Sequence, residues 1–267
     1  MLRSSQVRYS TALLLFLVPR FASAWGGEGH RLIVRLAESM LTPAARMAIA
    51  ATLEPGESLP ALASWADEVR PSRKETEPWH YVDIPLSSSG LDMKRDCPAN
   101  NCIVGKIEEF RKSWRDPSMP LATRRESLLF LIHFVGDLHE PLHCEDNHDH
   151  GGNDVPVRFE GEETNLHSVW DRRLLEHMPS EEQLLAEMAR AFTPEQMEAW
   201  AQGAVEEWAN ESFRIAQRTV YGLLPPANAD EIRLIDKRYE QMAAPVVELQ
   251  LEKAAARLAG ILNESAR

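Results

Sequence analysis

The chain has 267 residues, with 41 acidic and 29 basic side chains and a formal net charge of −12. This excess of carboxylates argues against a protein that grips duplex DNA through a basic surface, because that mode needs clustered Lys and Arg. It does not exclude an enzyme that acts on phosphodiesters, since bound cations can dominate a local field. The length suits one domain with a sizeable core, and nothing after residue 24 predicts a membrane span.

Residues 1–24 have the features of a secretory signal. These features are a basic start, a short apolar run and a small-residue cleavage site: Arg3 and Arg8, then 12–18, then Ala22-Ser23-Ala24. The alternative, an uncleaved anchor, is disfavoured because the run is too short to cross a bilayer. We therefore expect a secreted or periplasmic protein, cleaved between Ala24 and Trp25, whose single domain is 25–267.

Apolar residues at helical spacing, together with capping and stopping residues, predict a mostly helical chain. A residue pattern of period two predicts short strands near 80–84 and 154–160. The expected fold is one all-α domain with minor β-hairpins. Helices are expected over 32–40, from Thr42-Pro43 onward, and over 64–69, 123–139, 166–176, 180–192, 194–218 and 229–262, the last as one or two helices with a break or kink at Pro245.

There are three cysteines. Cys97 and Cys102 enclose a four-residue loop, which predicts a small disulfide in an oxidising compartment. Cys144 is left over. We expect a buried free thiol there, with a reactive thiol beside His143 as the alternative.

Two His/Asp pairs have the spacing of neighbours on a helix surface. His133 and Asp137 are four residues apart, and so are His167 and Asp171. On a helix, the two side chains of each pair would point to one face and lie about 6 Å apart. Such pairs also occur as ordinary hydrogen-bonded surface pairs. These two lie in apolar, aromatic-flanked segments, where an uncompensated carboxylate is costly, and this favours a bound cation.

The string His139-Glu140-Pro141-Leu142-His143 matches the H-E-x-x-H signature of zinc proteases. That signature needs a continuous helix, so that both histidines share one face. Pro141 removes an amide hydrogen and disfavours helical angles at the residue before it. The helix should therefore end near His139, which argues against a protease.

At this level of detail the chain resembles the S1/P1 nuclease family of secreted zinc enzymes that cut single-stranded nucleic acid. The similarity runs from residue 25 to about 262 in conserved order and spacing. It rests on these segments: Trp25-Gly26-x-x-Gly-His30, Ser64-Trp-Ala-Asp67-Glu-x-Arg70, Trp79-His80-Tyr-x-Asp83, His133-Phe-x-Gly-Asp137-x-His-x-Pro-Leu-His143, Gly151-Gly-Asn153, Asn165-Leu-His167-x-x-Trp-Asp171 and Ala244-Pro-Val-Val-Glu-Leu-Gln250.

The resemblance implies a phospholipase C/P1 nuclease-like fold and a centre of about three zinc ions, each with three or four protein ligands. Three ligand sets follow from it: Asp67, His80, His133 and Asp137 for one ion; the Trp25 amine and carbonyl, His30 and the bridging Asp137 for a second; His143, His167 and Asp171 for a third. It also implies roles for Arg70 at the scissile phosphate, Asp83 beside the attacking water, and Tyr81 and Asn153 in substrate binding.

The expected activity is hydrolysis of single-stranded DNA and RNA to 5′-phosphate products, with 3′-nucleotidase activity left open. Stacking on Tyr81 requires an unpaired base, which favours single strands. Without the resemblance, Tyr81 could equally be a core residue, and Arg70 a partner of Asp67 or Glu68. The alternatives are a zinc-dependent phospholipase C and a zinc-binding export protein without catalysis. Nucleic acids and nucleotides are the expected partners of a monomer that needs no stable protein partner and has no membrane span.

Overall fold

The computed structural model describes residues 25–191 and 193–264, so the expected signal at 1–24 lies outside the described residues. This part of the chain is predominantly helical, as predicted. Short 3₁₀ or π turns connect several helices. The helices are α1 Gly26–Ser39, α2 Pro43–Ala50, α3 Trp65–Val69, α4 Met93–Asp96, α5 Ile103–Arg115, α6 Leu121–His139, α7 Leu166–Ser168, α8 Leu174–Glu176, α9 Glu181–Ala191, α10 Pro194–Ala201, α11 Val205–Ile215 and α12 Lys237–Glu264.

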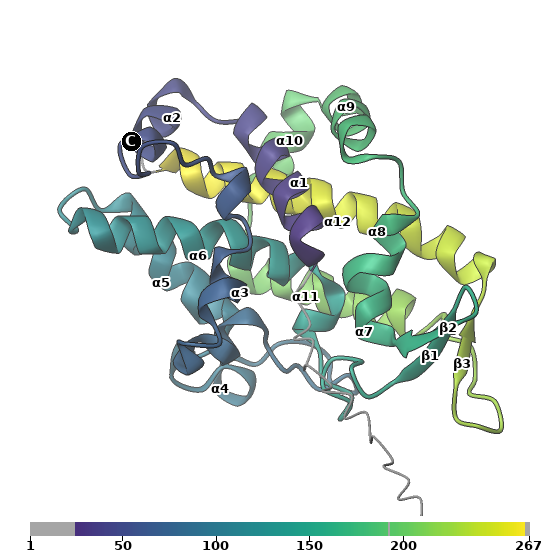
Figure 1. Ribbon diagram of the computed structural model, residues 1–267. Helices are drawn as coiled ribbons and strands as arrows, with labels where there is room; N and C mark the ends of the chain where they lie inside the picture. Colours follow the sequence, from purple (N-terminus) through teal and green to yellow (C-terminus); the bar gives the residue numbers. More distant parts are fainter. Residues whose placement is uncertain (1–24, 192, 265–267) are drawn as a thin grey trace, which may run out of the picture.

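Helix α6 lies at the centre of the molecule (Figure 1). It packs against α1, α3, α5, α11 and α12. Every residue from Ser127 to His139 is buried, so this stretch has no solvent face and belongs to the core on all sides. Its polar residues His133 and Asp137 are therefore surrounded by protein.

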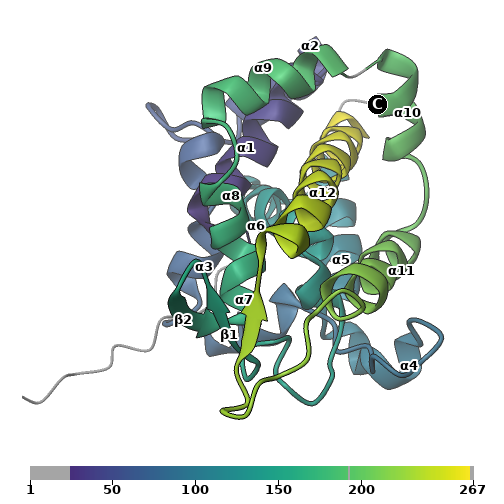
Figure 2. The same ribbon diagram turned by 90° about the vertical axis from the view of Figure 1, so that its right-hand side faces the viewer.

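A small sheet lies at one end of the bundle (Figure 2). Its strands are β1 Pro156–Phe159, β2 Glu162–Asn165 and β3 Arg233–Ile235, in the order β2-β1-β3. β1 and β2 form the expected hairpin, and β3 pairs with β1 in parallel. The chain leaves β2 directly into α7, so the hairpin positions the segment that carries His167.

Helix α12 corrects the prediction for 229–262. The segment begins with strand β3, and one helix then continues through Pro245 without a break. Pro245 lies on the exposed side of α12, whereas Ala243 and Val247 on either side are buried in the core. Water can therefore solvate the backbone groups that the proline leaves unpaired, while packing holds the helix together.

Two further predictions were wrong in detail. The helix expected over 194–218 is divided into α10 and α11 at Gly203, whose φ of +99° a helix cannot accommodate. The segment near 80–84, which was expected to be a strand, is extended but forms no regular strand. It is held by single backbone hydrogen bonds, such as Val82 N–H to the His143 carbonyl at 2.9 Å, rather than by a ladder.

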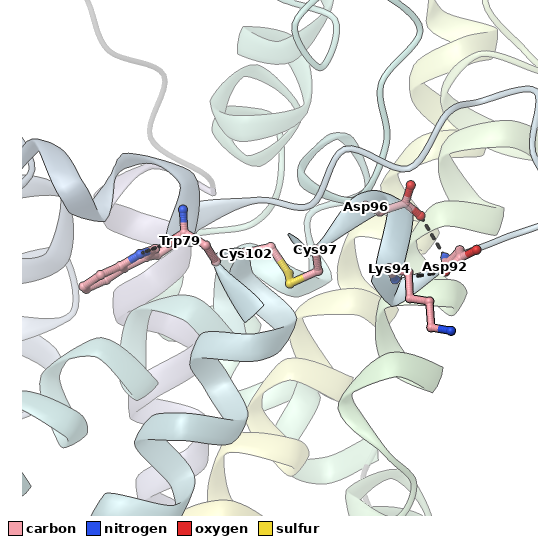
Figure 3. The surroundings of a disulfide bond; sticks show 7 residues. Trp79, Asp92, Lys94, Asp96, Cys97 and Cys102 are labelled. Atoms are coloured by element: carbon pink, nitrogen blue, oxygen red, sulfur yellow. Dashed lines mark hydrogen bonds between the residues drawn. A yellow bond between two sulfur atoms is a disulfide. The ribbon is translucent and has the colours of Figure 1, made fainter. Parts of the chain in front are cut away.

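The predicted disulfide joins Cys97 and Cys102 (Figure 3). Asn101 of its loop accepts a hydrogen bond from the Trp79 indole at 2.8 Å. The backbone N–H of Ile103, just after the loop, donates to the Tyr81 carbonyl at 3.0 Å. The loop thus supports the segment that carries His80. Cys144 is a buried free thiol, as expected, and donates to the Leu138 carbonyl.

Replacing Cys97 and Cys102 together by serine should lower the free energy of unfolding by about 2 kcal/mol, because a cross-link closing so short a loop restrains little of the unfolded chain. Urea unfolding of the double variant and of reduced wild type should give the same loss. A loss in the double variant that reduction of wild type does not reproduce would contradict this account.

Candidate metal centre

Histidines and carboxylates from α1 and α6 meet in the core. His30 Nε2 lies 3.1 Å from one carboxylate oxygen of Asp137, and His133 Nε2 lies 3.3 Å from the other. The two rings stack with centroids 3.9 Å apart. His30, His133 and Asp137 are completely buried. The i, i+4 spacing in α6 therefore directs both side chains into one interior site.

Asp67 and His80 complete this first group from two other elements. His80, at the end of the 3₁₀ segment Lys74–His80, places Nδ1 2.9 Å from Asp137 Oδ2 and 3.8 Å from Asp67 Oδ1. Asp67, on α3, lies 3.7 Å from His133 Nε2 through its other oxygen. The Asp137 carboxylate thus contacts three imidazoles and lies between the atoms contributed by His30 and those contributed by His80 and His133.

A second group forms where the chain leaves α6. His167 Nε2 lies 3.2 Å from Asp171 Oδ2, and the His143 and His167 rings are 5.1 Å apart. His143 belongs to the 3₁₀ turn Pro141–Cys144 and Asp171 to the π turn Val169–Arg173. Glu140 joins them: it, His143, His167 and Asp171 each offer one ligand atom, and these atoms lie within 4.8 Å of one another.

Backbone carbonyls fix the orientation of three of these imidazoles. The Nδ1 atoms of His133, His143 and His167 lie 2.8, 2.8 and 2.6 Å from the carbonyls of Ala63, His80 and Gly151. Because Nδ1–H donates to a carbonyl oxygen, Nε2 of each ring faces the site and can bind a metal ion once it is unprotonated. Metal-binding histidines are oriented in the same way.

The buried polar atoms of these groups fit a set of metal ions. Several of their inward-facing atoms have no hydrogen-bond partner among the described residues, although such atoms are normally paired. The atoms concerned include Nε2 of His80, His133, His143 and His167, and Oδ1 of Asp137 and Asp171. Imidazole nitrogens and carboxylate oxygens are zinc ligands. A zinc ion bound here would therefore pair these atoms and balance the negative charge of the carboxylates.

The electrostatics of the groups are strongly coupled. Burial lowers the pKa of His133, but Asp137 and Asp67 outweigh it and raise this pKa to about 9. Burial likewise lowers the pKa of His167, and Asp171 raises it to about 9. Burial lowers the pKa of His143 to about 4. The protons on His133 and His167 balance buried carboxylates, and a divalent cation must displace them to bind.

Trp25 lies immediately before α1 and is completely buried. Its indole donates to the Gly136 carbonyl at 2.9 Å, next to Asp137, and its carbonyl accepts from Gly29 N–H at 3.0 Å. Trp25 is therefore held beside the turn of α6 that carries Asp137. Its assignment as a metal ligand stays a prediction.

A cavity of about 430 Å³ opens above the centre. The histidines that line it are His80, His143, His167 and His150, and the predicted substrate residues Arg70, Tyr81, Asp83 and Asn153 all lie in its wall. Arg70 is also 3.3 Å from Asp67. Partial burial, Asp146 and Asp96 raise the pKa of Asp83 to about 6, which still leaves it mostly ionised at neutral pH.

An acidic cluster at the cavity wall was not predicted from the sequence. Glu145 lines the cavity. Its carboxylate and that of Asp149 each lie 2.9 Å from the Tyr221 hydroxyl, which is their hydrogen-bond donor. Burial, with the nearby Asp149, raises the pKa of Glu145 to about 8. Glu140 was also missed as a member of the second group, although it lies midway between Asp137 and His143 in sequence. That position was the one signal for it.

The protease interpretation fails for the reason given by Pro141. Helix α6 ends at His139, whose Nδ1 contacts the Val135 carbonyl and whose Nε2 accepts from Arg257 at 2.8 Å. His139 thus belongs to a structural network on the other side of the helix end from His143. The two histidines of the motif share no site.

The fold and the site define a class: a helical bundle with buried imidazole and carboxylate groups beneath a polar cavity. The family model for S1/P1 nuclease matches residues 25–267, and the chain belongs to this family. It is 29% identical to Endonuclease 3 of Arabidopsis thaliana over 94% of this chain and 92% of that protein. It is 28% identical to Nuclease P1 of Penicillium citrinum, over 90% and 97% of the two chains. Nuclease S1 of Aspergillus oryzae is 31% identical over 57% and 55%.

Within the described residues, no helix is both long and apolar enough to cross a membrane.

Changing Gly136 to alanine should displace His30. A methyl group there would lie 2.7 Å from His30 Nδ1 and 2.8 Å from its Cε1, closer than atoms can approach. We expect the variant to lose about one metal equivalent, as measured by elemental analysis. Ala37→Gly on α1 loses a methyl group without adding one and is the control. Undiminished metal binding by the Gly136 variant would contradict this geometry.

Proposed function

We propose that this protein is a zinc-dependent nuclease that hydrolyses single-stranded DNA and RNA. The observation that carries the proposal is the convergence of buried, unpaired imidazole and carboxylate atoms directly below a cavity whose wall holds an arginine, a tyrosine and a carboxylate. Family membership supports it, since relatives bear the names endonuclease and nuclease.

Three ions would be held by three sets of residues. We assign Asp67, His80, His133 and Asp137 to the first, Trp25, His30 and Asp137 to the second, and His143, His167 and Asp171 to the third. Zinc bound there would lower the pKa of a water molecule towards 7 and stabilise negative charge on phosphate oxygens. The chain supplies the geometry, because the ligands of each set come from at least two helices or turns whose packing is fixed by the core.

The residues of the cavity wall complete the site. Arg70 can neutralise charge that develops on the phosphate, and Asp67 restrains its guanidinium. Asp83, a carboxylate at neutral pH, can accept a proton from water. Tyr81 offers a half-buried ring for stacking, and Asn153 donates to the His150 carbonyl at 2.8 Å, which holds its amide at the cavity. We infer 5′-phosphate products, with 3′-nucleotidase activity as a further outcome of the assay.

Purified protein should contain about three zinc ions per chain and cut single-stranded DNA and RNA much faster than matched duplex. Elemental analysis and cleavage assays, with phosphatidylcholine as a parallel substrate, measure both. One zinc ion or none, equal rates on single and double strands, or faster hydrolysis of phosphatidylcholine would contradict the proposal.

Tyr81→Ala should raise KM for single strands roughly tenfold or more, because stacking on an aromatic ring contributes about 1–3 kcal/mol per base. Zinc content should not change, since Tyr81 is not among the proposed ligands. Tyr81→Phe keeps the ring and should behave like wild type. An alanine variant with unaltered KM would show that the ring only packs against its neighbours.

We further propose that cleavage after Ala24 is part of active-site assembly, in a protein that is secreted or periplasmic. The free α-amine of Trp25 and its carbonyl oxygen can chelate a metal, and an amine with a reference pKa near 8 readily gives up its proton to do so. An amide nitrogen, present when residues precede Trp25, is a far poorer ligand.

A form with an N-terminal extension, shown by mass spectrometry to be uncut, should therefore lose the ion assigned to Trp25 and His30 and most of its activity. A protease that exposes Trp25 should restore both. Full zinc content and activity in the extended protein would contradict the proposal.

A further inference from the structure

Glu140 is a buried carboxylate that the proposed ligand sets leave without a role. It caps the C-terminus of α6 with extended backbone angles (φ −81°, ψ 117°), and Pro141 starts the next turn. Its side chain is completely buried. Neither carboxylate oxygen has a hydrogen-bond partner among the described residues. A carboxyl group buried in this way is costly unless a cation or a donor meets it.

The atoms around Glu140 form a potential metal site. One oxygen of Glu140, one nitrogen each of His143 and His167 and one oxygen of Asp171 all lie within 4.8 Å of one another. Ligand atoms of a tetrahedral zinc ion are about 3.3–3.6 Å apart, given bond lengths near 2.0–2.2 Å. Small side-chain rotations would bring the four atoms to that spacing. His143 Nε2, His167 Nε2 and Asp171 Oδ1 are unpaired too.

The break in the helix is what brings Glu140 and His143 together. After α6 ends, the backbone N–H of His143 donates to the Glu140 carbonyl at 3.0 Å and closes a tight turn. Both side chains then belong to the same group of four. Pro141, which removes the protease geometry, thus creates a different pairing within the same five residues.

We propose that Glu140 is a fourth protein ligand of the ion held by His143, His167 and Asp171. This inference rests on the proposed zinc-dependent function. Two imidazoles and two carboxylates satisfy tetrahedral zinc completely, and the two negative charges balance its charge of +2.

The fourth ligand changes the character of this site. Zinc sites with four protein ligands are typically structural and tightly closed, whereas catalytic sites leave a position for water or substrate. His143 and His167 line the cavity, so a phosphate oxygen that approaches this ion must compete with Glu140 or enter as a fifth ligand. The ion should consequently be retained more firmly than three protein ligands would allow.

The test compares Glu140→Gln with Glu145→Gln. Both residues are buried acids of the same stretch. Glu145, however, accepts a hydrogen bond from the Tyr221 hydroxyl and lies outside the group of four. Glutamine keeps the size of the side chain and can still donate a hydrogen bond, so a merely space-filling or protonated Glu140 would tolerate the change. Each protein is dialysed against a zinc chelator at graded concentrations, and bound zinc is measured by elemental analysis.

We expect Glu140→Gln to release one zinc ion per chain at a chelator concentration at least tenfold lower than wild type needs, while Glu145→Gln follows wild type. Circular dichroism verifies that both variants are folded. Equal zinc retention by Glu140→Gln and wild type would overturn the inference. Wild type without zinc would overturn the proposed function and this inference together, so the two failures are distinguishable.

Cobalt substitution provides a second readout that does not depend on activity or affinity. Four-coordinate Co²⁺ absorbs visible light much more strongly than Co²⁺ with five or six ligands. If Glu140 completes the tetrahedron, Glu140→Ala replaces its carboxylate by one or more water molecules and changes the visible spectrum of the cobalt protein, whereas Glu145→Ala does not. An unchanged cobalt spectrum in Glu140→Ala would contradict the assignment even if the variant were less stable.

Discussion

The need to compensate buried carboxylates governs the arrangement of this protein. Asp137 lies in the last turn of α6, within a stretch of that helix that is buried on every side, where water cannot solvate its charge. His30, His80 and His133 meet it from three segments far apart in sequence. The orientation of the His133 ring depends in turn on the backbone carbonyl of Ala63. The packing of α1, α3 and α6 therefore follows from the environment that one carboxylate needs.

Buried hydrogen bonds also hold the end of the same helix. At the C-terminal end of α6, the His139 carbonyl accepts from Gln250 at 2.8 Å and the Leu138 carbonyl accepts from Ser212 at 2.7 Å. Side chains of α11 and α12 thus satisfy carbonyls that the end of the helix leaves unpaired. The turn that follows carries Glu140 and His143. It is consequently held by these hydrogen bonds on one side, and on the other it joins the second group of candidate ligands.

Much of the candidate site was predictable because helical spacing is a local property. The pairs His133/Asp137 and His167/Asp171 face one another as the i, i+4 rule requires, even though the second pair lies on a π turn. The disulfide followed from a short loop between two cysteines. The resemblance to the S1/P1 nuclease family supplied the grouping of distant ligands, which spacing alone could not give.

The features that the sequence did not predict are those that tertiary contacts decide. Packing on both sides carries α12 through Pro245, and a three-residue strand such as β3 has too little pattern to be recognised. Gly203 divides a stretch that otherwise has helical spacing. Glu140 was read as part of a protease motif, and only the fold reveals that its carboxylate faces His143, His167 and Asp171.

The negative charge of the protein bears on how the candidate metal centre could attract a phosphate. A formal charge of −12 should repel nucleic acid, and the wall of the cavity adds Glu77, Asp83, Glu145 and Asp146, with Arg70 as its one guanidinium among the described residues. If the centre holds metal ions as we propose, the positive charge that attracts a phosphate comes mainly from these cations, which act at short range because salt screens longer distances. An acidic surface with such a cationic centre would admit a strand that can bring its phosphate down to the metal ions, while its outer face would offer little to a rigid duplex. In our proposal, selectivity for single strands therefore depends on where the charge lies as well as on the ring of Tyr81.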